Sequence, residues 1–256
     1  MPSISGRATR TKWIALVALC AGLYGAVSIQ PLKIPAVAAG GTKINPEAVL
    51  GPVFGIILGP WLGVAATFLG VLVAIAIPSP SGGGGLGPWA FLTIPSPVLG
   101  SLISGVLSHR ASRGPLDRAK WIIPLGAFGL LLAAWYLSPV GPDMYYYVAP
   151  HFVALGIALL LCFVLKGILR LGPSRLAAAV TAVVFCGTMI DHLWGSVMFA
   201  YNGGWLFGLT KEALIGAFAA VTVIFILERI VITILGVLLS GALITALRRA
   251  NLLPQD

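Results

Sequence analysis

Long apolar runs follow one another along almost the whole chain and leave room for little else. A transmembrane helix needs about 20 mostly apolar residues, which gives this chain room for about seven or eight spans. Hydrophobic residues make up 59% of the 256 residues and charged residues only 9%, whereas soluble domains carry about 25% charged residues. The sequence therefore predicts an all-α polytopic membrane protein in which residues 1–256 form a single integral membrane domain.

Basic residues gather in the segments between the apolar runs. They precede the first run at Lys12, occupy the loops 109–120 and 166–175, and end the last run at Arg248 and Arg249. Short basic loops are cytoplasmic by the positive-inside rule, so we expect both termini in the cytoplasm. Membrane topology thus accounts for the net charge of +9. Aromatic residues do not interleave with the basic clusters as they do in single-strand binders, and we expect no nucleic-acid partner.

Proline and glycine divide the predicted spans. We expect membrane segments over about 13–29, 47–59, 61–77, 89–108, 121–136, 148–165 and 176–200. The Gly59-Pro60 pair joins the second and third of them. Pro95 and Pro97 lie in the outer turns of the fourth and should kink or break it, because proline removes a helical hydrogen bond.

The final apolar stretch, 213–247, is far longer than one crossing needs. If two full spans filled it, the basic end of the chain would fall outside the cell, against the positive-inside rule. We therefore predict a partial or re-entrant segment over 213–227 on the outer side, followed by a last span that ends in the cytoplasm.

Two charged pairs interrupt otherwise apolar segments. Asp191-His192 falls in the outer third of one span, and Glu228-Arg229 interrupts the last stretch. An aspartate at the centre of a spanning helix costs about 2.5–3.5 kcal/mol on insertion scales, so such residues face protein or water and are often functional. The pairs could face a ligand. Alternatively, Asp191 and Arg229 could form an internal salt bridge that pins two helices together.

Sequence motifs for catalysis and metal binding are absent. The chain contains no HExxH, GxSxG or P-loop motif. The cysteines lie in apolar runs without CxxC spacing, and the histidines are scattered: Cys20, Cys162, Cys186, His109, His151 and His192. We therefore expect no catalytic residues, metal or cofactor, and we do not expect an enzyme. A transporter of this kind would draw its energy from an ion gradient or from a partner.

Small residues recur every fourth position in the first predicted helix. Ala18, Gly22 and Ala26 form one row, and Ala21 and Gly25 form another. Such rows let helices approach closely in lipid. They could pack against this chain's own helices or against a partner subunit.

Four segments together resemble the substrate-binding S components of energy-coupling factor (ECF) transporters, which import vitamins and related nutrients in prokaryotes. ALVALCAGLYGA resembles the family's docking helix, and NPEAVLGPVFGIILGPWLGVAATFLGVLVA resembles its second and third helices. SPVLGSLISGVL resembles the end of the fourth helix, and LERIVITILGVLLSGALITALRR resembles the last. The resemblance covers about two thirds of the chain. It implies an ECF S-component-like bundle of about six core spans, here joined by an extra helical pair over about 121–138 and 148–166.

The resemblance also implies partners and a site. Ala18, Ala21, Gly22, Gly25 and Ala26 would dock on a transmembrane coupling subunit, although the family's strict Ala-x-x-x-Ala motif is absent. Two cytoplasmic ATPase subunits would complete the assembly in the cell membrane of a prokaryote. The residues that match the family's outward-facing ligand site are Lys33, Asn45, Asp191, His192, Trp194, Tyr201, Asn202 and Glu228.

The leading hypothesis is therefore a vitamin- or nutrient-binding S component, in which polar residues orient a small molecule and aromatic residues pack on it. A second hypothesis is a self-contained secondary transporter that uses Asp191 and Glu228 as proton or cation sites. A third is an intramembrane enzyme with Asp191-His192 as an acid–base pair. The aromatic residues near the outer ends of the spans are also typical of the membrane interface, whatever the function.

Overall fold

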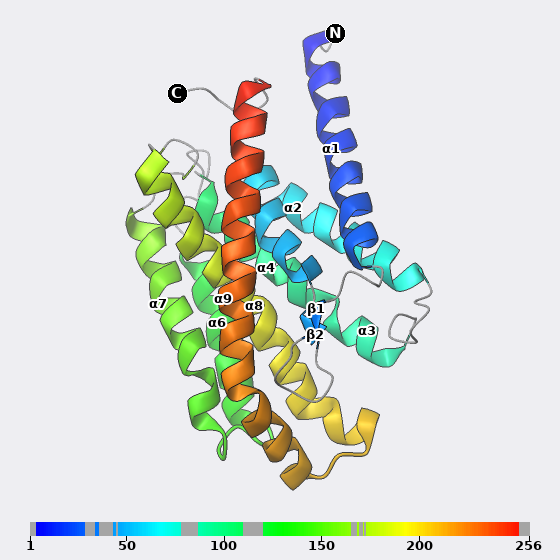
Figure 1. Cartoon of the computed structure of the whole chain (residues 1–256), viewed down its shortest axis with the longest axis vertical. Helices are drawn as coiled ribbons and strands as arrows, with labels where there is room; N and C mark the ends of the chain where they lie inside the picture. The colour runs from blue at the N-terminus through cyan, green and yellow to red at the C-terminus, as the bar shows by residue number, and fades with distance from the viewer. Residues whose placement is uncertain are drawn as a thin grey trace.

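The computed structural model describes residues 4–28, 34–35, 43–44, 46–77, 87–109, 120–164, 168, 171 and 173–250. These residues form a bundle of helices (Figure 1). Six of its helical segments are long and apolar enough to cross a membrane, and α6 is a shorter apolar helix. The chain is a multi-pass helical membrane protein, as its composition predicted.

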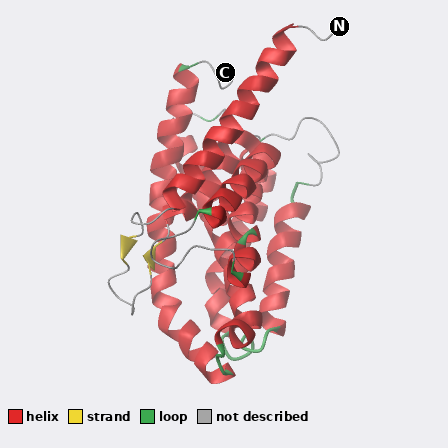
Figure 2. Cartoon of the chain, turned by 90° about the vertical axis from the view of Figure 1, so that its right-hand side faces the viewer, coloured by secondary structure: helices red, strands yellow, loops and turns green. Residues whose placement is uncertain are grey.

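The first half of the described chain contains α1 (Ile4–Ser28), the 3-10 helix η1 (Pro46–Val49), α2 (Leu50–Ala76), α3 (Pro88–Thr93) and α4 (Pro95–Ser108). The second half contains α6 (Ile122–Leu137), the 3-10 helix η2 (Tyr145–Val148), α7 (Ala149–Val164), α8 (Pro173–Phe207) and α9 (Lys211–Arg249). Two short strands, β1 (Ile34–Pro35) and β2 (Lys43–Ile44), pair antiparallel, with Ile34 opposite Ile44. They lie at one side of the helices (Figure 2). Helices α6 and α7 occupy the two segments that were predicted over about 121–138 and 148–166.

The start of α1 and the end of α9 lie at the same end of the bundle (Figure 1). The turn between α8 and α9 lies at the opposite end (Figure 1). Lys211 at the start of α9 forms a salt bridge with Asp143, 2.8 Å away, in the connection between α6 and α7. That connection therefore shares the end of the bundle that holds the α8–α9 turn. The basic starts of α6 and α8 consequently lie at the end that holds the chain termini.

Glycine and proline break the helices where the sequence predicted. The backbone of α2 departs from helical geometry at Gly59, with φ 82° and ψ 177°. Only glycine adopts such a conformation readily, and Pro60 follows it without an N–H to continue the hydrogen-bond ladder. The kink divides α2 into the two short arms expected on either side of the Gly59-Pro60 pair. The predicted interruption near Pro95 is also confirmed, since α3 ends at Thr93 and α4 begins at Pro95.

The predicted re-entrant segment over 213–227 is wrong. Residues Lys211–Arg249 form one continuous helix of 39 residues, in which Glu228 and Arg229 interrupt nothing. The Thr210 hydroxyl caps its start by accepting a hydrogen bond from the Ala213 N–H at 3.2 Å, and the basic residues of its last turn suit the negative end of the helix dipole. The helix stays intact because Glu228 and Arg229 find partners on their own and neighbouring helices.

Helix α8 runs through the centre of the described bundle and contacts α4, α6, α7 and α9. It crosses α4 at two glycines. A Cβ atom on Gly100 would lie 2.9 Å from the carbonyl oxygen of Gly187, and one on Gly187 would lie 3.0 Å from that of Gly100. Small residues at a crossing let two helix backbones approach closely. This crossing determines which polar side chains of α4 and α8 meet.

Candidate functional site

A cavity of about 320 Å³ lies among α1, η1, α2, α3, α4, α8 and α9. Its size is within the range of about 300–1,000 Å³ that is typical of small-molecule sites. Asp191 and Arg229 lie near the midpoints of α8 and α9, so the cavity lies near mid-height of the bundle, and residues near the end of α1 and the start of α4 complete its wall. Its polar and aromatic lining residues are Tyr24, Glu47, Trp89, Thr93, Ser96, Asp191, His192, Glu228 and Arg229.

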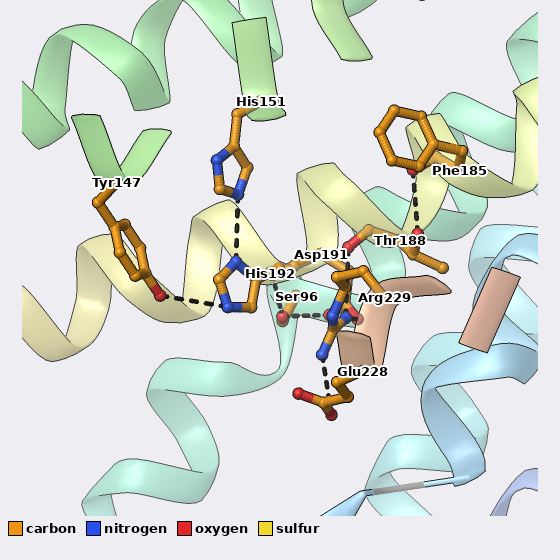
Figure 3. Close-up of polar contacts among 9 residues, drawn as sticks. All are labelled: Ser96, Tyr147, His151, Phe185, Thr188, Asp191, His192, Glu228 and Arg229. Atoms are coloured by element: carbon orange, nitrogen blue, oxygen red, sulfur yellow. Dashed lines mark hydrogen bonds and ion pairs between the residues drawn. The ribbon is translucent and has the colours of Figure 1, made fainter. Parts of the chain in front are cut away.

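Arg229 on α9 is the centre of the charged part of this lining (Figure 3). Its Nη1 lies 3.5 Å from Oδ2 of Asp191 on α8, and its Nη2 lies 3.2 Å from Oε1 of Glu228. Nη1 also donates to the carbonyl oxygen of Thr188 at 3.4 Å. Asp191 and Arg229 are each only 7% exposed. A buried charge needs such a partner, because removing one member of a buried ion pair costs about 3–5 kcal/mol.

Ser96 holds the other side of the Asp191 carboxylate. Its hydroxyl donates to Oδ1 of Asp191 and lies 2.6 Å from the Asp191 carbonyl oxygen. The glycine crossing explains the contact, since Ser96 lies one helical turn before Gly100 and Asp191 one turn after Gly187 in antiparallel helices. Asp191 is thus fixed by α4 on one side and by α9 on the other.

His192 belongs to a different set of contacts. Its Nε2 lies 3.3 Å from the Tyr147 hydroxyl, and its Nδ1 lies 3.1 Å from Nε2 of His151. The Phe225 ring stacks on it with the ring centroids 4.4 Å apart. In Figure 3 Tyr147 approaches His192 from the side opposite Arg229. The polar atoms of His192 therefore face α7, although the residue also lines the cavity.

Three of the predicted ligand residues, Asp191, His192 and Glu228, line one cavity. The predicted alternative, a salt bridge between Asp191 and Arg229, is also present. The two interpretations are compatible, because the ion pair forms part of the cavity wall. Three of the seven acidic residues in the chain, Glu47, Asp191 and Glu228, line this cavity.

Three other predicted ligand residues, Trp194, Tyr201 and Asn202, are not among the described residues that line it. Trp194 donates from its ring N–H to the Leu92 carbonyl oxygen at 2.8 Å, and Tyr201 donates to that of Ala134 at 2.9 Å. Asn202 donates to the Met198 carbonyl oxygen at 2.9 Å on its own helix. The polar groups of Trp194 and Tyr201 thus join α8 to α3 and α6, whereas that of Asn202 bonds its own helix. Lys33 and Asn45 lie outside the described residues.

Sequence reasoning missed Tyr24, Glu47 and Ser96 as cavity residues. Glu47 could have been found, because it is the first acidic residue of a chain that has only seven. Ser96 gave no such signal, since a serine within an apolar helix commonly bonds its own backbone. Among the described residues, no group of three His, Cys, Asp or Glu side chains is placed to hold a metal ion.

The predicted docking residues of α1 separate onto two faces. Ala21 and Gly25 are buried against α2, where a Cβ atom on Gly25 would lie 2.5 Å from Cγ1 of Val73. Ala18, Gly22 and Ala26 are exposed, and a Cβ atom on Gly22 would meet nothing within 4 Å. One row of small residues therefore packs within the chain, and the other row is accessible.

Comparisons with known proteins leave the function open. No protein family model matches the chain, and no solved structure matches it. The chain is similar to an uncharacterized protein of Methanocaldococcus jannaschii, with 29% identity over 197 residues. The match covers 76% of this chain and 58% of that relative, so it spans little more than half of the relative's length.

Proposed function

We propose that this protein is the substrate-binding S component of an ECF-type importer for a vitamin or related small nutrient. The cavity carries the proposal: it combines a buried ion-pair network with aromatic walls inside a multi-pass membrane protein. Ligand sites are concave and mostly apolar, with a few fixed polar groups that orient the ligand. Ser96, Asp191, Glu228 and Arg229 would orient the molecule, and Tyr24 and Trp89 would pack on it.

The basic helix ends supply the orientation. If they are cytoplasmic, as the positive-inside rule favours, the end of α1 and the start of α4 that line the cavity point toward the outer face, where a nutrient arrives. A coupling subunit would then dock on the exposed row of Ala18, Gly22 and Ala26, and two cytoplasmic ATPases would drive release. The absence of a nucleotide-binding motif from the sequence fits this division of labour.

Native mass spectrometry of the protein, gently extracted from its own membranes, tests the proposal. We expect a vitamin-sized molecule bound to the chain, together with a transmembrane partner and ATPase subunits. A chain that repeatedly emerges without a small molecule and without partners would contradict it.

A pair of glycine variants tests the docking surface. We expect Gly22→Leu to leave the folded chain intact and to abolish co-purification with the coupling subunit, because position 22 is open. Gly25→Leu is the matched comparison, and it should destabilise the chain itself by clashing with Val73. Normal assembly of the Gly22→Leu chain would exclude this face as the docking surface.

A second candidate is the ion-gradient-driven secondary transporter. Asp191 and Glu228 share one guanidinium in the cavity wall, an arrangement in which a proton or cation could compete with Arg229. This function predicts uptake into proteoliposomes under an ion gradient alone, abolished by Asp191→Asn. The S-component proposal predicts no uptake without the partner subunits.

A further inference from the structure

The two histidines at the α7–α8 contact form a hydrogen-bonded chain that the proposed site does not require. It runs from Ser196 through the Tyr147 hydroxyl and both ring nitrogens of His192 to His151. Each contact measures 3.1–3.3 Å between heavy atoms. Tyr147 and His151 belong to η2 and α7, which form part of the helical pair beyond the six core spans of the resembled family.

These hydrogen-bonded side chains are buried in aromatic surroundings. Tyr147, His151 and Ser196 are buried, and the Phe225 ring covers a face of His192 with an interplanar angle of 15°. Tyr147 in turn stacks on Trp135 of α6, with centroids 5.0 Å apart. Buried polar groups in such surroundings are costly unless they are paired. The contacts to Tyr147 and His151 therefore restrict how the His192 ring can turn.

The hydrogen-bond geometry also restricts where the protons lie. One nitrogen of a neutral histidine donates and the other accepts, and the partner of each nitrogen selects the tautomer. Because Tyr147 and His151 engage Nε2 and Nδ1 of His192, neither nitrogen is left to bind a molecule in the cavity. His192 lines the cavity as part of a flat ring surface, and the polar contacts fall to Ser96, Asp191, Glu228 and Arg229.

We infer that Tyr147 and His151 are positioning residues, which fix the His192 ring in the cavity wall and so give the extra helices α6 and α7 a role in ligand binding. The consequence for ligand binding rests on the proposed function. The fixed orientation of His192 does not, because it follows from contacts within the chain. A flat ring packed against His192 is the ligand feature that this arrangement would favour.

Nitrogen NMR of the full chain in lipid nanodiscs tests the positioning directly. The chain has only three histidines, so ¹⁵N-histidine labelling gives a spectrum that single variants can assign. We expect His151→Phe to move the Nδ1 resonance of His192, and Tyr147→Phe to move its Nε2 resonance, because each variant keeps the ring and removes one partner. His151→Gln should restore the Nδ1 position by supplying a polar group again.

Two controls accompany these variants. Tyr146→Phe removes a neighbouring hydroxyl that donates to the Met144 sulfur at 3.4 Å, and it should leave His192 unchanged. The His109 resonances, at the end of α4, should not move in any variant. If neither His151→Phe nor Tyr147→Phe shifts the His192 resonances, the inference is wrong.

Native mass spectrometry of the same variants separates this inference from the proposed function. Loss of one hydrogen bond near a site weakens binding by about two- to tenfold, so we expect a smaller fraction of His151→Phe and Tyr147→Phe chains to retain the molecule that co-purifies with the wild type. Unchanged retention alongside shifted resonances would overturn the role of α7 in binding. A wild-type chain without any retained molecule would count against the proposed function, while the resonances would still decide the positioning of His192.

Discussion

The contact between α8 and α9 has two sides that differ in chemistry. On the cavity side, Asp191 and Arg229 form a buried ion pair that Ser96 and Glu228 extend. On the α7 side, one residue further along α8, His192 stacks on Phe225. Its hydrogen-bond partners there, Tyr147 and His151, are aromatic rings as well. Charge therefore borders the cavity, and hydrogen-bonded aromatic rings border α7.

The neighbouring residues Asp191 and His192 thus lie in two different environments. Successive residues of a helix point about 100° apart, so Asp191 and His192 cannot both face the same partner squarely. The sequence suggests a single polar pair, whereas the structure divides it between two contact sets. Phe225 and Arg229 lie one turn apart on the same face of α9, so one face of this helix meets both His192 and Asp191. Both sides are thus linked through the same two helices.

The largest effect should come from breaking the charged side. Arg229→Met removes the only guanidinium that contacts the Asp191 and Glu228 carboxylates in the described cavity wall. We expect a loss of about 3–5 kcal/mol in the free energy of unfolding, because a buried carboxylate is left without its counter-charge. Unfolding in mixed detergent micelles measures it. Adding Asp191→Asn to Arg229→Met should recover part of the loss, and a double variant that is no better than Arg229→Met would contradict the coupling.

The next effect concerns binding more than folding, because Arg229 keeps Glu228 as a counter-charge when Asp191 is neutralised. Asp191→Asn keeps the side-chain volume but removes the charge that faces the cavity. A hydrogen bond to a charged group contributes about 1.5–3 kcal/mol, so affinity should fall by at least about tenfold. The co-purified molecule in native mass spectra, or its dissociation constant once identified, measures the change. Undiminished binding by Asp191→Asn would remove Asp191 from the ligand site.

A smaller effect is expected from the neutral side. His192→Phe keeps the stacking on Phe225 and removes the contacts to Tyr147 and His151. Leaving a buried polar partner unpaired costs about 1–3 kcal/mol of unfolding free energy, which is less than the loss of a buried counter-charge. The same micelle titration gives the comparison. If His192→Phe destabilises the chain more than Arg229→Met does, the contrast between the two sides is wrong.

The smallest effect should come from breaking an exposed ion pair at the end of the bundle. Lys211 and Asp143 lie 2.8 Å apart, and both side chains are about half exposed. Exposed pairs contribute little because water already solvates both charges. Lys211→Met should therefore leave the unfolding midpoint almost unchanged, and it serves as the charge-removal control for Arg229→Met. A large shift in the unfolding midpoint would mean that an exposed ion pair stabilises this protein as much as a buried one does.

The local features of this fold could be predicted from the sequence. Length and hydropathy indicated the spans, while Gly59-Pro60 and Pro95 marked the breaks, because glycine and proline act on their own backbone. The continuous helix through Glu228 could not be predicted in this way, since its polar residues are satisfied by partners that only the fold supplies. The positions of Trp194 and Tyr201 outside the cavity lining could not be predicted for the same reason. Their acceptor carbonyl oxygens belong to distant helices, and the sequence does not reveal how those helices cross.

Helix α9 has a consequence for how the protein sits in different bilayers. At 1.5 Å per residue its 39 residues measure about 58 Å, roughly twice the hydrocarbon thickness of about 30 Å. A rigid rod of that length must tilt or project into the interface, and the tilt changes with bilayer thickness. Arg229 lies near its midpoint, so tilting about the centre moves the two ends and leaves the charged wall at nearly constant depth. Lipids that change the bilayer thickness should therefore change how far the ends of α9 project from the membrane, whether or not a ligand is bound.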